Sequence, residues 1–476
     1  MTEHRRGPTR GWGRGRGRGR GRGSCVRPRK FEPTAPAVGS LLATITRGEL
    51  ALSSASSSDK KVPRITGCKV VGSYNWLNRK SPTILVPGTP PAWTPTRELA
   101  KLPQDNGTYF RDQNAARYAV HVFQPAVEAI LNRNPEFDFN QIDIVACGST
   151  LGNLRRFIAG LDKGFRFVVE AVGSAVFLVR RENSPTQTIS DVFGYGHTFP
   201  EANTTWGPDA KGSESHQRIL QYNFAGLSCL IRYEGDGYLP NLYQPRVFHG
   251  ETTANTPEDL LISLNQVTVS SIGSGEEQAL SIETGGQTIP QSAMFDLKTR
   301  SATKQYSDVL KSELPRLWIA QVPNFVIGFH RHGIFDDVRV EDVREEVRQW
   351  EADHEDELRN LSTLLELLIA FAHGQPDGRY EVVFKGTDGN GELELREVGG
   401  EVNCCISDSM KRRWTVGDLP GRAKKDEVDV GEEEDDDWER GWKEREDTVW
   451  GGDSESEKDF TACSASSCGY CGHCGY

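Results

Sequence analysis

The two ends of this chain differ from its middle so strongly in composition that they limit which residues can form a packed core. Residues 1–30 contain eleven Lys and Arg residues against a single Glu, and residues 10–23 read Arg-Gly-Trp-Gly followed by five Arg-Gly pairs. Residues 426–460 contain seventeen Asp and Glu residues against four Lys and Arg residues. Neither end can bury enough apolar surface to offset the entropy lost on ordering. We therefore predict no stable structure in residues 1–60 or 405–476.

The middle of the chain is long enough for one large domain. The mean hydropathy of the 476 residues is −0.54, which is low because both ends are so polar. Without its ends the chain keeps roughly 340 residues, and a domain of that size buries about three quarters of its unfolded surface. We predict a disordered arm and linker over residues 1–61 and a single catalytic-type α/β domain over 62–402. That domain carries a polar insertion at about 241–294, and a disordered acidic tail follows over 403–476.

The ten cysteines are scattered or bunched late in the chain, and neither a secretory leader nor a run of 18 apolar residues is present. These features are typical of a reduced, intracellular protein, so we expect the nucleus, the cytoplasm or both. Arg-Gly tracts bind phosphates and stack on bases without sequence preference, which makes RNA the expected partner. The alternative is that the tract serves only solubility or import.

Two pairs of charged side chains are placed on predicted strands. Apolar residues alternate with other residues before the first pair, at Leu227, Cys229, Ile231 and Tyr233. Every second side chain of a strand shares a face, so Glu234 and Asp236 project together. In Phe295-Asp-Leu-Lys298 the same alternation puts Asp296 and Lys298 on one face.

Carboxylates and a lysine in this pattern suit metal-assisted phosphodiester hydrolysis. Carboxylate oxygens hold Mg²⁺ or Mn²⁺, and an ammonium group can orient or deprotonate the attacking water. The alternative is that charges gather at strand ends simply because strand ends reach water. The sequence alone leaves both interpretations open.

The order of motifs along the chain resembles a known family. Gly194-Tyr-Gly-His-Thr-Phe-Pro-Glu201 precedes the Glu-x-Asp pair, and the Asp-x-Lys pair follows it. Trp318-Ile-Ala-Gln321 and an apolar segment that ends in Gly328-Phe329 come next. This order resembles the DXO-type decapping exoribonucleases, which are remote members of the PD-(D/E)XK nuclease superfamily. The resemblance implies a mixed α/β fold, in which a mixed sheet is flanked by helices.

The resemblance also implies roles for individual residues. Divalent metals would be held by four carboxylates, namely Glu201, Glu234, Asp236 and Asp296. Lys298 would orient the attacking water, and Gln321 would help to hold substrate phosphate. Gly148 stands here at the position where the family has an arginine. Arg155 or Arg156, further along the same predicted helix, could replace that arginine. The gap between Asp236 and Asp296 is also longer than in the family.

Later elements agree with this family. Apolar residues at helical spacing predict one long amphipathic helix between Val343 and Leu368. Strands at Tyr380–Lys385 and Glu392–Val398 flank Asp388-Gly-Asn-Gly391, which is a strong hairpin signal. Two other candidate sites are weaker. Ser149 is better explained as a helix cap than as a nucleophile. His330 and His332 are better explained as part of a solvated turn than as a metal site.

The sequence therefore supports three hypotheses. The first is a divalent-metal-dependent RNA 5′-end hydrolase of the decapping or exoribonuclease type. The second is a catalytically weak or inactive module on the same fold that binds RNA ends or a protein. The third follows from a resemblance to fungal proteins labelled geranylgeranyl pyrophosphate synthetase. It would require an all-helical bundle with Asp336, Asp337 and Asp342 lining a cavity, and the β-rich pattern of residues 142–330 argues against it.

Overall fold

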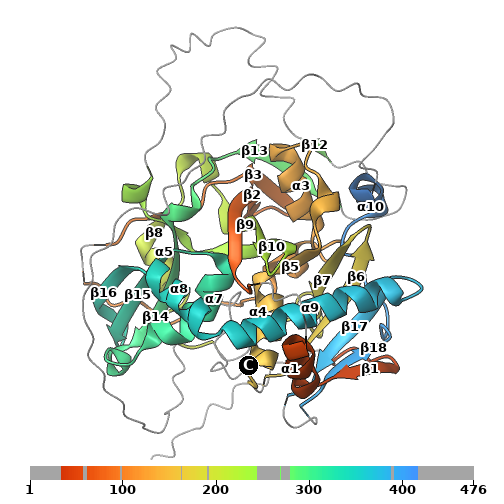
Figure 1. The fold of residues 1–476 in the computed structure, drawn as a ribbon. Helices are drawn as coiled ribbons and strands as arrows, with labels where there is room; N and C mark the ends of the chain where they lie inside the picture. Colours follow the sequence, from red (N-terminus) through yellow and green to blue (C-terminus); the bar gives the residue numbers. More distant parts are fainter. Residues whose placement is uncertain are drawn as a thin grey trace, which may run out of the picture. The chain divides into compact units, whose positions relative to one another are not determined.

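The computed structural model describes residues 34–56, 62–96, 99–161, 163–189, 192–243, 279–386 and 391–415 in full, and residues 268–269 by their backbone alone (Figure 1). The Arg-Gly tract, the acidic run and most of the predicted polar insertion lie outside these residues. The predictions made for those segments therefore stay predictions.

Most described strands belong to one large mixed sheet. Within the described residues its order is β1 (Leu41–Ile45), β18 (Leu393–Arg396), β17 (Arg379–Phe384), β6 (Phe165–Val172), β7 (Ala175–Arg180), β5 (Ile144–Cys147), β10 (Leu227–Gly235), β9 (Ser213–Phe224), β2 (Ile65–Leu77), β3 (Thr83–Pro87), β13 (Ser281–Gly285) and β12 (Thr268–Val269). In the middle of the sheet, β5 pairs in parallel with both β7 and β10. The carboxyl ends of these three strands therefore meet at one edge.

Helices cover both faces of the large sheet because its central strands are apolar on both sides. Ile144 and Ala146 of β5 face one core and Val145 faces the other. The first core is covered by α4 (Gly148–Ile158), α7 (Val309–Ala320) and α9 (Glu355–Gly374). The second core is covered by α3 (Gln124–Arg133) and α10 (Asp408–Thr415). The other helices of the described residues are α1 (Arg47–Ser56), α2 (Gln113–Arg117), α5 (Thr198–Asn203) and α8 (Arg344–Asp353).

A second, smaller sheet lies beside the large one. Its order within the described residues is β16 (Ile334–Asp342), β15 (Asn324–Arg331), β14 (Met294–Ser301), β11 (Gly237–Tyr238), β4 (Ala92–Trp93) and β8 (Thr204–Thr205). Strands β14 and β15 are parallel, and α7 connects them. Strand β16 turns back along β15 as an antiparallel hairpin.

The chain passes directly from the large sheet to the small one. Strand β10 ends at Gly235, and β11 begins at Gly237 beside Phe295 of β14. A Cβ atom at Gly237 would come within 2.6 Å of both the Phe295 ring and the Pro91 carbonyl oxygen. Glycine is required there by the close approach of these groups. Asp236 is thereby held at the junction between the sheets.

The ordered core extends beyond the predicted boundaries at both ends. Residues 41–56, expected to be linker, form β1 and α1, because β1 pairs with β18 and Leu50 is fully buried. Residues 408–415, expected to be disordered tail, form α10, which buries Met410 and Trp414. These pairings are long-range, so local composition does not reveal them.

Two further predictions need correction inside the domain. The last part of the expected polar insertion contains β13, which pairs in parallel with β3. The predicted long helix is two helices, α8 and α9, which meet at His354. The His354 backbone leaves the helical conformation there, and its ring stacks on Trp350 with ring centroids 4.6 Å apart.

The mixed α/β fold with helices flanking the sheet is confirmed. The described residues form two sheets with flanking helices, so they do not form the all-helical bundle that the synthase hypothesis requires. Asp336, Asp337 and Asp342 belong to β16, at one edge of the small sheet. In the part of the chain that the structure describes, no helix has the length and apolar character needed to span a bilayer.

Candidate functional site

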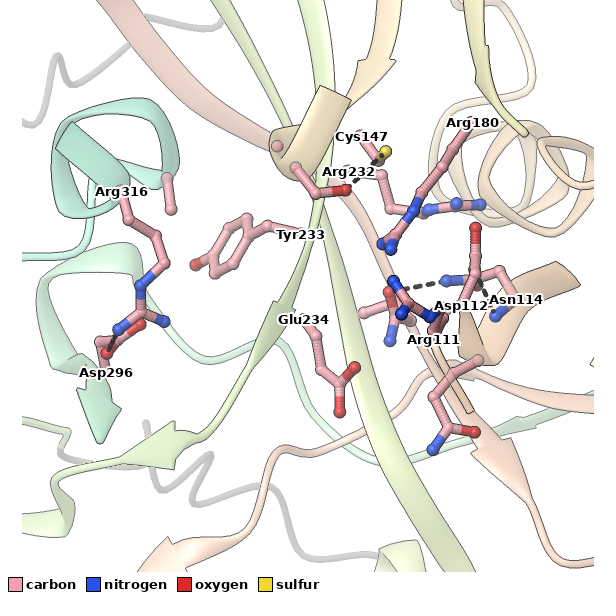
Figure 2. Close-up of a pocket in the computed structure, with 15 residues that line it drawn as sticks. Arg111, Asp112, Asn114, Cys147, Arg180, Arg232, Tyr233, Glu234, Asp296 and Arg316 are labelled. Atoms are coloured by element: carbon pink, nitrogen blue, oxygen red, sulfur yellow. Dashed lines mark hydrogen bonds and ion pairs between the residues drawn. The ribbon is translucent and has the colours of Figure 1, made fainter. Parts of the chain in front are cut away.

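A pocket opens where the carboxyl ends of β5, β7 and β10 face the small sheet, and it encloses a cavity of about 60 Å³ (Figure 2). Crevices outside the carboxyl ends of parallel strands are common ligand sites in α/β folds. The residues that line the pocket are Arg111, Asp112, Gln113, Asn114, Cys147, Gly148, Ser149, Arg180, Gln217, Arg232, Tyr233, Glu234, Asp296, Arg316 and Ala320.

The predicted Glu-x-Asp and Asp-x-Lys pairs lie on adjoining strands at this pocket. Glu234 and Asp296 both line it. One carboxylate oxygen of Asp236, Oδ2, accepts a hydrogen bond of 2.7 Å from the backbone N–H of Leu297. This bond ties the junction between the sheets to the strand that carries Asp296 and Lys298.

Burial and charge shift the pKa values of two of these carboxyl groups. Burial raises the pKa of Asp296 to about 7, although the positive charge of Arg316 opposes the rise. Burial also raises the pKa of Asp236, again against the charge of Arg316. The negative charge of Asp236 adds to the rise at Asp296, and the negative charge of Glu234 adds to the rise at Asp236.

A buried ion network behind the pocket holds Asp296. The guanidinium group of Arg316 donates a hydrogen bond to Asp296 Oδ1 and contacts Glu313 Oε2 at 3.2 Å. Glu313 is only 1% exposed, and Arg300 Nη2 contacts its other carboxylate oxygen at 3.0 Å. The Lys298 ammonium nitrogen lies 4.0 Å from Glu313 Oε2. Glu313 is therefore shared by three cations, which reduces the cost of burying them.

Sequence reasoning missed Glu313 and Arg316. The available signal was their spacing, since residues three apart on a helix are neighbours and can form an ion pair. That spacing does not indicate which strand the pair faces. The contact with Asp296 depends on how α7 packs against β14.

Other predicted site residues lie away from the lining of this pocket. Glu201 is an exposed residue of α5, and its charge acts on Tyr109. Gln321 ends α7 in a left-handed conformation, and its side-chain amide donates to the Trp318 carbonyl oxygen at 2.6 Å. Arg155 contacts Glu357 of α9 at 3.6 Å and lies over the Trp350 ring. Arg156 is buried in α4 and hydrogen-bonds Asn153. The roles predicted for these residues stay predictions.

The four predicted metal ligands are not gathered around one point. Among the residues that the structure describes, no three Asp, Glu, His or Cys side chains are arranged to hold a metal ion. Arg316 pairs with the Asp296 carboxylate, and a backbone N–H binds Asp236. The side chains as they lie thus do not fit a divalent cation, because the Arg316 guanidinium group already occupies Asp296 Oδ1.

Three arginines that the sequence did not single out form the other side of the pocket. Figure 2 shows Arg111, Arg180 and Arg232 on that side, with Glu234 between them and the Arg316–Asp296 pair. Arg232 is held in place, because its Nη1 donates to the Val122 carbonyl oxygen at 2.5 Å and its guanidinium carbon lies 4.7 Å from the Phe123 ring centroid.

The first turn of α4 adds to this positive side. The helix begins at Gly148, directly after β5, and Cys147 makes no side-chain capping hydrogen bond. Gly148 and Ser149 line the pocket, so the positive end of an eleven-residue helix is presented to it. Guanidinium groups and a helix N-terminus together favour an anion.

A model of the family described as Domain of unknown function (DUF8563) matches residues 50–390. No curated protein matches the chain. Solved structures of Rai1 and Dxo1, members of the family that the motif order resembles, do match. Scheffersomyces stipitis Rai1 in complex with (3′-NADP)⁺ and calcium ion is 13% identical, with a TM-score of 0.49 over 79% of this chain and 99% of that one. Candida albicans Rai1 in complex with pU5-Mn²⁺ is 10% identical, with a TM-score of 0.47, and the match covers 75% of this chain and 97% of that one. Kluyveromyces lactis Dxo1 in complex with manganese is 10% identical, with a TM-score of 0.39, and the match covers 77% of this chain and 98% of that one.

Proposed function

The chain belongs to the family described as Domain of unknown function (DUF8563), and from the pocket itself we propose that it binds the phosphorylated 5′ end of RNA. The observation that carries this proposal is the convergence of Arg111, Arg180, Arg232 and the first turn of α4 on one small cavity. The helix N-terminus favours an anion, and guanidinium groups suit phosphate oxygens in particular. Arg180 also pairs with Glu182, and Arg111 Nη1 lies 3.9 Å from the same carboxylate, so a bound phosphate would share these two arginines with Glu182.

The size of the cavity supports a terminal phosphate group. Its volume of about 60 Å³ is several times smaller than the roughly 300–1,000 Å³ of pockets that hold a whole small-molecule ligand. A whole nucleotide does not fit into that space, so the rest of the ligand has to lie outside. The Arg-Gly tract of residues 10–23 is typical of segments that bind an RNA backbone, which favours RNA as the source of the phosphate.

The test compares short RNAs that differ only at their 5′ end. Purified full-length protein is titrated into labelled RNA with a 5′ hydroxyl, monophosphate or triphosphate, and fluorescence anisotropy is measured. We expect the phosphorylated ends to bind more tightly. Arg111→Gln should remove most of that preference, by about tenfold, because a hydrogen bond to a charged group contributes about 1.5–3 kcal/mol. Arg111 is preferable to the more deeply buried Arg232, whose loss would also disturb the fold.

Arg79→Gln is the matched control. The Arg79 side chain is 52% exposed and pairs with Glu283 at 3.6 Å. It should leave the preference for phosphorylated ends unchanged. Equal affinity for all three RNAs, or an equal loss for all three in Arg111→Gln, would show that the pocket does not hold the 5′ phosphate.

Hydrolysis of the bound RNA end is a second candidate function. It is favoured by the Asp296 carboxyl group, whose pKa of about 7 suits proton transfer near neutral pH, and by Lys298 on the same strand. The pairing of Asp296 with Arg316 weighs against the metal-dependent form of this activity.

Metal titrations separate the two candidates. Because Arg316 already occupies one oxygen of Asp296, we expect Mn²⁺ and Mg²⁺ to raise the melting temperature of the wild type very little and to leave RNA uncut. Arg316→Gln frees the carboxylate and should increase the Mn²⁺-dependent shift. A large shift in the wild type that Asp236→Asn or Asp296→Asn abolishes, together with RNA cleavage that Lys298→Ala slows, would instead establish the metal-dependent hydrolase.

A further inference from the structure

A second cleft, of about 590 Å³, lies beside the β15–β16 turn and the end of β14. It is far from the first pocket, since Asp296 and Ser301 are five residues apart on β14 and a strand rises about 3.3 Å per residue, or about 17 Å in all. A volume of this size is in the range that holds a whole small-molecule ligand. From the chemistry of its walls we propose that this cleft binds a nucleotide by stacking its base and pairing its phosphate.

One aromatic ring at the cleft is open to solvent. Tyr306 is 95% exposed and lines the cleft together with Phe193, which is 38% exposed. Nucleobases stack on such rings whatever their sequence, because every base has a π face.

The charge of the cleft suits the phosphate of a nucleotide. Arg331 and His332 stand exposed at its rim, and none of the described residues that line it is Asp or Glu. The first pocket differs in this respect, since Asp112, Glu234 and Asp296 line it. The Arg331 guanidinium can form a forked pair with a phosphate.

The walls of the cleft are held in place without a ligand. The turn at His332-Gly333 has positive φ angles, and the Gly333 carbonyl oxygen accepts a hydrogen bond of 2.9 Å from Leu102 N–H. A Cβ atom at Gly333 would come within 2.6 Å of the Leu102 carbonyl oxygen, so this turn requires glycine. On the opposite side, Gln305 donates to Asp337 Oδ2 at 2.7 Å. A preformed cleft loses little entropy when it binds.

The proposal is tested by binding measurements on the full chain with adenosine and uridine 3′-monophosphates, their nucleosides, and a ten-nucleotide RNA with a 5′ hydroxyl. None of these probes carries a 5′ phosphate, which keeps the group proposed for the first pocket out of the measurement. Tyr306→Ala should weaken binding at least about fivefold because a stacking face is lost, whereas Tyr306→Phe keeps that face and should bind as the wild type does. Arg331→Ala should reduce the affinity for a monophosphate to that for its nucleoside, and Arg79→Ala should change nothing.

The outcomes also identify the source of the nucleotide. If the monophosphates bind and Tyr306→Ala weakens that binding, a free nucleotide is a sufficient ligand. If only the RNA shows such Tyr306-dependent binding, the ligand is a nucleotide unit within a strand. Both support the proposal. It is overturned if no probe binds, or if Tyr306→Ala binds as tightly as the wild type while its unfolding curve is unchanged. Because Tyr306 is almost fully exposed, this substitution should not disturb folding.

Discussion

At the scale of residues, the candidate site is governed by one shared carboxylate. Glu313 stands between Lys298, Arg300 and Arg316, and Arg316 extends this network to Asp296. Buried charges are tolerated only when they are paired, so these side chains depend on one another. The same pairing explains why the Asp-x-Lys motif does not form an open metal site in this arrangement.

The raised pKa of Asp296 predicts a dependence of stability on pH. Its folded value of about 7 lies above the ordinary value of 3.8, so between these values the folded chain holds a proton that the unfolded chain has released. The free energy of unfolding should therefore fall as the pH rises through this window. Asp296→Asn cannot ionise and should show a weaker fall, as measured by urea unfolding at pH 5 and pH 8.

The exposed Asp336 supplies the control for this experiment, because Asp336→Asn removes a carboxylate without touching the buried network. It should keep the pH dependence of the wild type. Parallel stability curves for the wild type and Asp296→Asn would show that Asp296 titrates normally in the folded chain, and the general acid–base role would lose its support.

At the scale of elements, α10 is the clearest example of a helix that tertiary contacts stabilise. It has only eight residues, and an isolated helix of that length is not stable in water. Its Trp414 is 1% exposed and stacks on Phe139, with ring centroids 4.0 Å apart. The centroid of the Phe177 ring lies 4.9 Å from that of Trp414. The helix therefore closes the second core, although it follows the predicted end of the domain.

Truncating Trp414 should destabilise the whole domain. Trp414→Ala removes a fully buried ring and leaves a cavity between α10 and the large sheet, so we expect a loss of about 3–5 kcal/mol in the free energy of unfolding. Urea unfolding followed by circular dichroism measures the change. The exposed Arg412 on the same helix is the control, and Arg412→Ala should stay within about 0.5 kcal/mol of the wild type. A similarly small effect of Trp414→Ala would mean that α10 does not contribute to the core.

At the scale of the whole molecule, charge is separated along the chain. The basic arm of residues 1–30 and the acidic run of residues 426–460 lie outside the described residues, but their sequences have opposite sign. Opposite charges on one chain attract each other, and the acidic run can therefore compete with RNA for the basic arm. Such competition weakens RNA binding without altering either pocket.

Deleting residues 426–460 should tighten RNA binding at low salt. The deletion removes seventeen acidic and four basic residues, a net charge of −13, and the gain should shrink as added salt screens the charges. Anisotropy titrations at two salt concentrations measure it. Deleting residues 461–476, which contain no Asp, Glu, Lys or Arg, is the control and should leave affinity unchanged. Unchanged affinity after the first deletion would argue against this competition.

The sequence by itself determined the features that depend on neighbouring residues. The alternation before Glu234 predicted β10, the Asp-x-Lys motif predicted that Asp296 and Lys298 share a strand, and the mixed α/β class followed from the motif order. The first two depend on a local period, because side-chain direction repeats every two residues in a strand, whereas the fold class depends on the resemblance of the motif order to a known family.

Only the tertiary structure decided which distant residues meet. Arg180 and Arg232 reach one pocket because β5 pairs in parallel with β7 and β10, and Arg111 joins them from the segment before α2, where its backbone N–H binds the Gln187 carbonyl oxygen. Arg316 reaches Asp296 because α7 packs beside β14. Similarly, β1 is ordered because it pairs with β18, and α10 is ordered because its apolar side chains pack into the second core. Such contacts have no local period in the sequence, since they depend on strand order and helix packing over hundreds of residues.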